Sequence, residues 1–115
     1  MGASQRRKGH GGERELCTLL SDLLGRVVQR HLGQAREGGA DIEVGPFLIE
    51  CKRRARIAGV HDWMAQAEHA AERLRNAEPG IRPRVPVIAF RADGEEWLVA
   101  FALEDAVQLM RVALG

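Results

Sequence analysis

The sequence predicts a single α/β domain in which a mixed β-sheet is flanked by helices, in the order αβββαββα. Three observations favour this fold class. Apolar residues recur with helical spacing between Glu13 and Leu24. Short apolar-rich runs on both sides of Gly45-Pro46 indicate a β-hairpin. With 115 residues and 45% hydrophobic content, the chain is long enough for one domain with its own core and too short for two.

The chain begins with a Gly- and Arg-rich arm, residues 1–12, that has no hydrophobic periodicity. We expect this arm to be flexible and the folded domain to span residues 13–115. An amphipathic helix follows from Glu13 to Leu24 and is ended by Gly25. Because Glu13 is in line with the apolar stripe of this helix, its carboxylate is predicted to face inward, although a charge that complements the helix dipole is the simpler interpretation.

A hairpin is predicted in the next part of the chain. Arg26 to Leu32 is rich in β-branched residues and is expected to be the strand before it, with a polar link from Gly33 to Gly39. The hairpin strands are Ala40 to Val44 and Phe47 to Lys52. A loop centred on Gly45-Pro46 sets their register, because directly opposed residues in an antiparallel pair share a face.

The predicted register gives the hairpin one polar and one apolar face. It places Asp41 opposite Glu50, and the alternation of side chains adds Lys52 to the same face. The other face is expected to carry the apolar residues Ile42, Val44, Phe47, Ile49 and Cys51.

Two opposed carboxylates repel one another unless a cation lies between them. Oxygen ligands on a rigid hairpin suit a hard ion such as Mg²⁺ or Mn²⁺. Lys52 would then orient a water molecule or stabilise charge on a pentavalent phosphorus. The alternative is an exposed Glu50–Lys52 ion pair without a catalytic role.

The charge distribution favours a polyanion as the partner. The net charge is +1, but residues 1–56 carry 11 Lys or Arg against 7 Asp or Glu, whereas residues 57–115 carry 6 against 9. Lys8 and Lys52 are the only lysines, so arginine is used for almost every other cation. A compact ammonium at position 52 is therefore chemically distinctive.

The second half of the chain predicts a helix, two strands and a closing helix. These are His61 to Ala77, Val85 to Arg91, Trp97 to Leu103 and Glu104 to Leu114. The two cysteines, Cys17 and Cys51, are expected to be reduced, buried and structural. No apolar run approaches membrane-spanning length and no signal-peptide pattern is present, so a cytoplasmic protein is expected.

An ordered set of short motifs resembles the Holliday junction resolvases of the archaeal type, within the PD-(D/E)xK nuclease superfamily. The motifs are Arg7-Lys8-Gly9, Glu13-Arg14-Glu15, Gly39-Ala40-Asp41-Ile42, Glu50-Cys51-Lys52, Gln66 and a late strand with Trp97. The resemblance implies a restriction-endonuclease-like core. The chain departs from the pattern at Ala40, where proline is usual, and in having no serine between Gly33 and Gly39.

The resemblance also implies roles for individual residues. Asp41, Glu50 and the backbone carbonyl of Cys51 would bind the metal, and Glu13 would complete the site through a water or a second ion. Lys52 would activate the attacking water, with Gln66 as an accessory residue. The residues expected to contact DNA are Arg6, Arg7, Lys8, Arg14, Gln34, Arg36, Arg53 and Arg54.

The sequence therefore predicts a Mg²⁺-dependent endonuclease that cuts branched DNA, such as four-way junctions, in DNA recombination or repair, and that acts as a homodimer. One alternative is a PD-(D/E)xK nuclease with another task, such as restriction or phage DNA processing. Another is an inert DNA-binding module, which would need cations but not clustered carboxylates.

Overall fold

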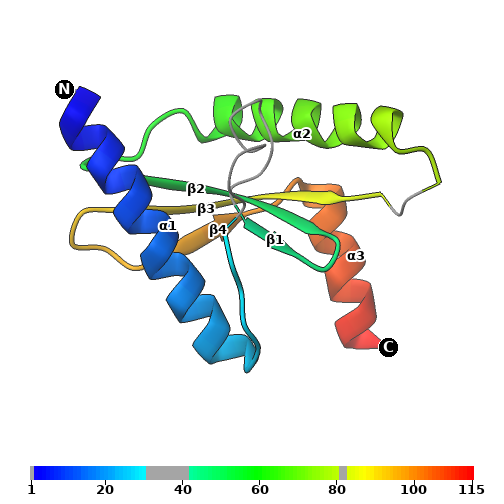
Figure 1. Cartoon of the computed structure of the whole chain (residues 1–115). Coiled ribbons are helices and arrows are strands. Elements are labelled where there is room, and N and C mark those ends of the chain that lie inside the picture. The colour runs from blue at the N-terminus through cyan, green and yellow to red at the C-terminus, as the bar shows by residue number, and fades with distance from the viewer. Residues whose placement is uncertain (1, 31–41, 81–82) are drawn as a thin grey trace.

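The computed structural model describes residues 2–30, 42–80 and 83–115, with side chains from Gly11 onward. Its helices are α1 (Gly2–Leu24), α2 (Val60–Ala77) and α3 (Leu103–Leu114), and its strands are β1 (Ile42–Val44), β2 (Phe47–Arg54), β3 (Val85–Ala92) and β4 (Leu98–Ala100). The strands form one mixed sheet in the order β1-β2-β3-β4, flanked by the three helices (Figure 1). This arrangement confirms the predicted fold class.

The hairpin has the predicted register. β1 and β2 are antiparallel, with Ile42 opposite Ile49, Glu43 opposite Leu48 and Val44 opposite Phe47. Gly45 has a φ of 54°, a conformation that glycine adopts without steric cost, so it permits the tight turn. β2 and β3 are parallel, and α2 makes the crossover that a parallel pair requires.

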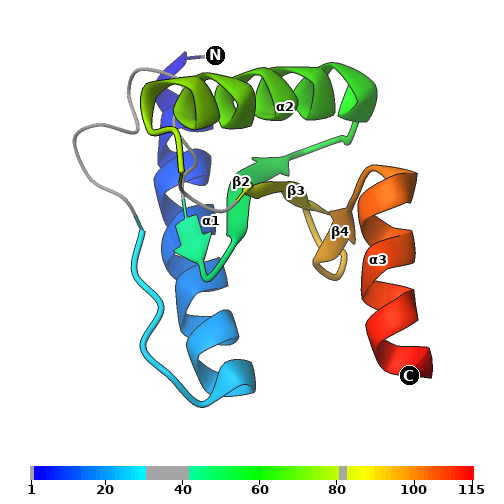
Figure 2. The ribbon, with the colours of Figure 1, turned by 90° about the vertical axis from the view of Figure 1, so that its right-hand side faces the viewer.

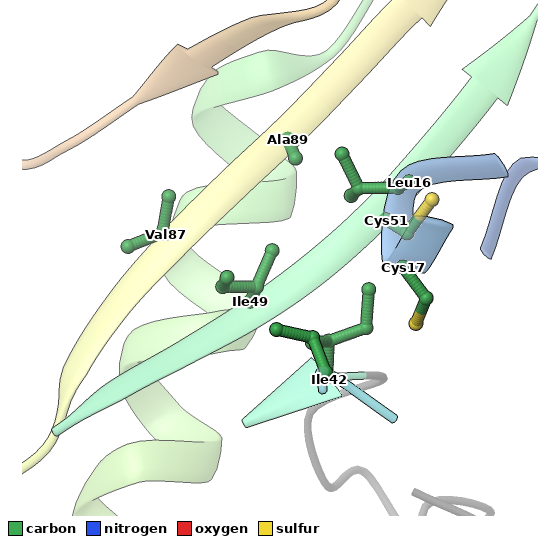
Figure 3. Close-up of a cluster of buried hydrophobic side chains, with 8 residues drawn as sticks. Leu16, Cys17, Ile42, Ile49, Cys51, Val87 and Ala89 are labelled. Atoms are coloured by element: carbon green, nitrogen blue, oxygen red, sulfur yellow. The ribbon is translucent and has the colours of Figure 1, made fainter. Parts of the chain in front are cut away.

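The central strands carry apolar side chains on both faces. On one face, Leu16 and Cys17 of α1 pack in a buried cluster with Val28, Ile42, Ile49, Cys51, Val87 and Ala89. Figure 3 shows this cluster on the α1 side of the strands, with α2 behind them. On the α2 side, Leu48 and Ile88 are buried, as are Ala67, Ala70 and Ala71 of α2. Both faces of β2 are therefore covered, and its polar residues lie at the margin of a packed layer.

α1 begins earlier than the sequence predicts. The helix starts at Gly2 rather than Glu13, so residues 2–12, expected to be an arm without secondary structure, are helical. Gly12 gives a physical reason: it is buried, and a Cβ atom there would lie 3.0 Å from Cβ of Arg53. This glycine therefore lets the helix backbone approach β2 closely, and does not end the helix.

The strand expected from Arg26 to Leu32 is much reduced. Among the described residues of this segment, only Arg30 pairs with the sheet, through an isolated bridge to Ile42. The backbone N–H of Val28 instead donates to the hydroxyl of Ser21 on α1, at 2.9 Å. The segment is thus tied to the helix that precedes it, while the order of the remaining elements agrees with the prediction.

The C-terminal strand and helix pack only loosely on the rest of the described structure. β4 is shorter than the predicted strand and pairs with β3 only through Leu98, Val99 and Ala100. No side chain of α3 is buried against the described part of the chain. Figure 2 shows α3 beside the β4 edge of the sheet, on the opposite side from α1. None of the helices in the described residues is long and apolar enough to cross a membrane.

Candidate active site

β2 holds Glu50 and Lys52 on one face of the sheet. The two residues are separated by one position, so strand alternation points both side chains the same way. Nζ of Lys52 lies 3.7 Å from Oε1 of Glu50, and their side chains are only 17% and 24% exposed. This is a half-buried pair rather than the fully exposed surface ion pair that was the alternative interpretation. A carboxylate and an ammonium are therefore held together where solvent access is limited.

The first turn of α2 lies over the same part of β2. Trp63 presents its indole ring to two cations, with Nζ of Lys52 at 5.7 Å and Cζ of Arg54 at 6.0 Å from the ring centroid. The turn is set by Gly59, which has a φ of 83° and whose carbonyl accepts a hydrogen bond from the N–H of Trp63 at 3.0 Å. The sequence predicts a helix from His61 to Ala77, but nothing in it indicates that Trp63 contacts Lys52.

Glu13 lies on α1, which packs against the face of the sheet opposite to Glu50 and Lys52. Its Oε2 is 3.4 Å from Nη1 of Arg30, and Arg30 bridges to Ile42, the residue after Asp41. Glu13 is therefore directed toward the start of β1, as the inward stripe predicted. Burial raises the pKa of the nearby Cys17 thiol, and the charge of Glu13 raises it further, whereas Arg30 acts in the opposite direction. This raised pKa supports a structural and not a nucleophilic role for Cys17.

The predicted metal ligands are placed only in part. Asp41 lies outside the described residues. Glu50 and Cys51 are consecutive on β2, and the side chain of Cys51 is buried in the core, which leaves its backbone carbonyl as the group that would serve as a ligand. Within the described residues, no three His, Cys, Asp or Glu side chains are grouped closely enough to hold a metal ion. A complete site would therefore need Asp41.

The donor chemistry of these residues fits Mg²⁺. Glu50 and the backbone carbonyl of Cys51 are oxygen donors on β2, and the carboxylate of Glu13 would have to reach the site from α1. The cysteine thiols, which would favour a softer metal, are directed into the core instead. The neighbouring Lys52 ammonium adds a positive charge that would attract a phosphate group of DNA.

The residues expected to contact DNA have different surroundings. Arg14 is exposed on α1. Arg53 lies 3.7 Å from Glu15 and 3.8 Å from Asp93, so two carboxylates compete with a phosphate for its guanidinium. Arg54 donates to the carbonyl of Arg53 at 2.9 Å. The side chains of Arg6, Arg7 and Lys8 and the residues Gln34 and Arg36 lie outside the described part of the structure.

Gln66, the predicted accessory residue, is exposed on α2. It lies one turn after Trp63, the residue that contacts Lys52. The structure thus shows Trp63 of α2 in contact with Lys52, whereas Gln66 is exposed. The role proposed for Gln66 stays a prediction.

A second polar cluster was missed by the sequence analysis. The carboxylate of Glu15 accepts a hydrogen bond from Nε1 of Trp97 at 2.7 Å and lies 3.1 Å from Nε of Arg91. These contacts join α1 to β3 and to the residue before β4, across more than seventy positions of sequence. No local pattern signals such a pairing, although Trp97 and Glu15 each belong to a motif singled out above. Its role is to fix α1 on the sheet.

Comparison with known proteins agrees with the geometry. The family model described as "Phage putative PDDEXK endonuclease" matches residues 4–113, almost the whole chain. No curated protein matches the sequence, and no solved structure matches it either. The match confirms the PD-(D/E)xK superfamily, whose nucleases generally depend on divalent metals, and does not extend to the archaeal Holliday junction resolvases. The chain therefore belongs to the family of phage PDDEXK endonucleases.

Proposed function

We propose that this chain is a Mg²⁺-dependent DNA endonuclease whose catalytic centre is the polar face of the β1–β2 hairpin. The observation that carries the proposal is the half-buried contact of 3.7 Å between Glu50 and Lys52 on β2. The two residues have the E-x-K spacing that appears in the name of the family. A lysine beside a carboxylate at a protected site suits phosphodiester hydrolysis better than simple DNA binding, which needs cations alone.

In the proposed mechanism, Asp41, Glu50 and the carbonyl of Cys51 would hold the ion, and Glu13 would complete the site. When bound, Mg²⁺ supplies positive charge against the scissile phosphate, and Mn²⁺ would substitute for it. Lys52 orients the attacking water. A bond forms from the water oxygen to phosphorus, the bond to the leaving oxygen breaks, and a proton from the water passes to solvent while the leaving oxygen is protonated. No covalent intermediate with the protein is involved.

The proposed substrate is branched DNA, with DNA processing in the phage life cycle as the second candidate role. The ordered motifs from Arg7 to Gln66 support the first, and the family described for phage proteins supports the second. Either role places the protein in the cytoplasm, where such DNA is found. The decisive experiment is incubation with four-way junction, flap, duplex and single-stranded DNA, each with and without Mg²⁺. Absence of cleavage of every substrate in Mg²⁺ would contradict the proposal.

A homodimer is part of this proposal, and the surface formed by β4 and α3 is its proposed interface. The large exposed apolar side chains on this surface are Leu98, Val99, Leu103, Leu109, Met110, Val112 and Leu114. Trp97 and Phe101 are also large and apolar, but both pack against the core, and Phe101 meets the ring of Phe47 edge-on at 6.2 Å.

A second copy of the chain fits this surface because the acidic and basic ends of α3 in one copy can pair with the opposite ends of α3 in the other. α3 has Glu104 and Asp105 in its first turn and Arg111 in its last. An antiparallel pairing of two such helices about a two-fold axis places the acidic end of one against the basic end of the other. Among the described residues, β4 is also an edge strand of the sheet. A dimer would place two catalytic centres on one branched DNA.

A further inference from the structure

Lys52 is approached from two sides by groups of different elements. Along β2, Oε1 of Glu50 lies 3.7 Å from the ammonium. From α2, the ring of Trp63 lies 5.7 Å from the same nitrogen, within the range of a cation–π contact. With its side chain 17% exposed, Lys52 is more constrained than a surface lysine.

This second contact has a consequence for the geometry of the site. A lysine side chain has four rotatable bonds, so an ion pair with one carboxylate leaves several positions open to its ammonium. A flat indole ring beside the same nitrogen removes many of them. In addition, the attraction of the ring for a cation is stronger where water is partly excluded.

The backbone that carries the ring is fixed at the start of α2. The backbone N–H of Trp63 donates to the carbonyl of Gly59 in the first turn of the helix. Cζ of Arg54 lies 6.0 Å from the ring centroid, and Nη1 of Arg54 is hydrogen-bonded to the carbonyl of Arg53. The ring thus packs beside two cations of β2, one of which is anchored to its own strand.

We propose that Trp63 is a positioning residue that holds the Lys52 ammonium at the proposed catalytic centre. The inference rests on the proposed nuclease function for its kinetic consequence, but the contact itself is independent of any activity. Trp63 acts through Lys52 and contributes little to DNA affinity. Loss of the ring is expected to lower the single-turnover cleavage rate by roughly ten- to hundred-fold, the scale of a misplacement near 1 Å.

The chain offers an unusually direct spectroscopic test. Lys8 and Lys52 are the only lysines, so ¹³C-lysine labelling gives two sets of side-chain signals. We expect the Lys52 Hε protons of the wild-type protein to be shifted by the ring current and to show nuclear Overhauser contacts to the indole protons. Trp63→Leu should abolish the shift and Trp63→Phe should retain part of it. Trp97→Phe is the control, because Trp97 binds Glu15 instead.

The kinetic arm compares the same variants with a DNA that the wild-type protein cleaves. We expect Trp63→Leu to cleave slowly in Mg²⁺ while binding DNA normally in Ca²⁺, and Trp63→Phe to recover most of the rate. Wild-type Lys52 signals without contacts to the indole would overturn the proposal, even if Trp63→Leu failed to fold. Normal cleavage by a folded Trp63→Leu would overturn it too. A wild-type protein that showed the contacts but cut no DNA would instead contradict the proposed function.

Discussion

The Glu13 carboxylate lies 3.4 Å from the guanidinium of Arg30, next to the point where the chain enters β1. Two residues further along α1, Glu15 accepts a hydrogen bond from Trp97 instead. The same helix thus presents two carboxylates to different surroundings. Glu13 pairs with Arg30 near the start of β1, whereas Glu15 connects α1 to the far strands of the sheet.

This difference predicts opposite effects for two matched substitutions. Glu13→Gln should lower Mg²⁺-dependent cleavage by about ten- to hundred-fold, the scale for groups that support a metal ion indirectly. Its effect on the free energy of unfolding should be less than about 1 kcal/mol, because the ion pair with Arg30 is partly exposed. Single-turnover cleavage and urea denaturation measure the two quantities.

Glu15→Gln is the control for Glu13→Gln. It weakens the acceptor for Trp97 and removes the charge opposite Arg91 and Arg53, so unfolding should become easier by about 1 kcal/mol. Cleavage by the folded protein should stay near the wild-type rate. If Glu15→Gln lost activity and Glu13→Gln kept it, the assignment of the two carboxylates would be reversed.

Gly12 and Gly11 predict a contrast in stability. Alanine is favoured over glycine inside a helix by about 1 kcal/mol, so Gly11→Ala should stabilise the protein, since its added Cβ would meet only the end of Arg53 at 4.0 Å. At Gly12 the same atom would lie 3.0 Å from Cβ of Arg53. Gly12→Ala should therefore destabilise the protein by about 1–3 kcal/mol. Equal urea midpoints for the two variants would show that α1 does not approach β2 this closely.

The hairpin could be predicted from sequence because its determinants are local. The dipeptide Gly45-Pro46 defines the turn, and alternation then assigns every side chain to a face, so the pairs from Ile42–Ile49 to Val44–Phe47 were predicted correctly. The contact between Glu50 and Lys52 follows from the same alternation. The helix predicted from His61 to Ala77 was equally readable, since α2 spans Val60–Ala77.

The features that were missed depend on tertiary contacts. The helix before Glu13 begins in a glycine-rich segment whose propensity is poor, and close packing at Gly12 favours it. The expected strand after Gly25 is reduced because the N–H of Val28 donates a hydrogen bond to the hydroxyl of Ser21 instead of to a neighbouring strand. The contacts of Trp63 with Lys52 and of Trp97 with Glu15 join distant segments, so no spacing rule predicts them.

Cys17 predicts how stability depends on alkaline pH. Because burial raises the pKa of its thiol in the folded state, the unfolded chain loses this proton first as pH rises. The stabilising contribution is complete below the ordinary thiol pKa of about 8.5 and is lost as pH rises through the folded value. The free energy of unfolding of the wild type relative to Cys17→Ala should therefore decrease between pH 8 and pH 10. A constant difference would contradict the burial of Cys17.

The exposed apolar side chains of α3 predict dimerisation. Met110→Glu should give a monomer at micromolar concentration, because a charge on the contact surface would be buried without a partner. Leu23→Glu is the control, since Leu23 is also exposed but lies on α1. Light scattering measures both. A wild-type protein that is monomeric with and without DNA would contradict the proposed interface.

Cleavage by Glu50→Gln, compared with Glu43→Gln, tests the central claim most directly. Both carboxylates belong to the hairpin and point to the same face, but Glu43 lies 2.7 Å from Arg84 whereas Glu50 lies beside Lys52. In single-turnover assays with Mg²⁺, we expect Glu50→Gln to lose more than about a hundred-fold in rate and Glu43→Gln to cleave normally. Cleavage at the wild-type rate by folded Glu50→Gln would show that the hairpin face is not the catalytic centre.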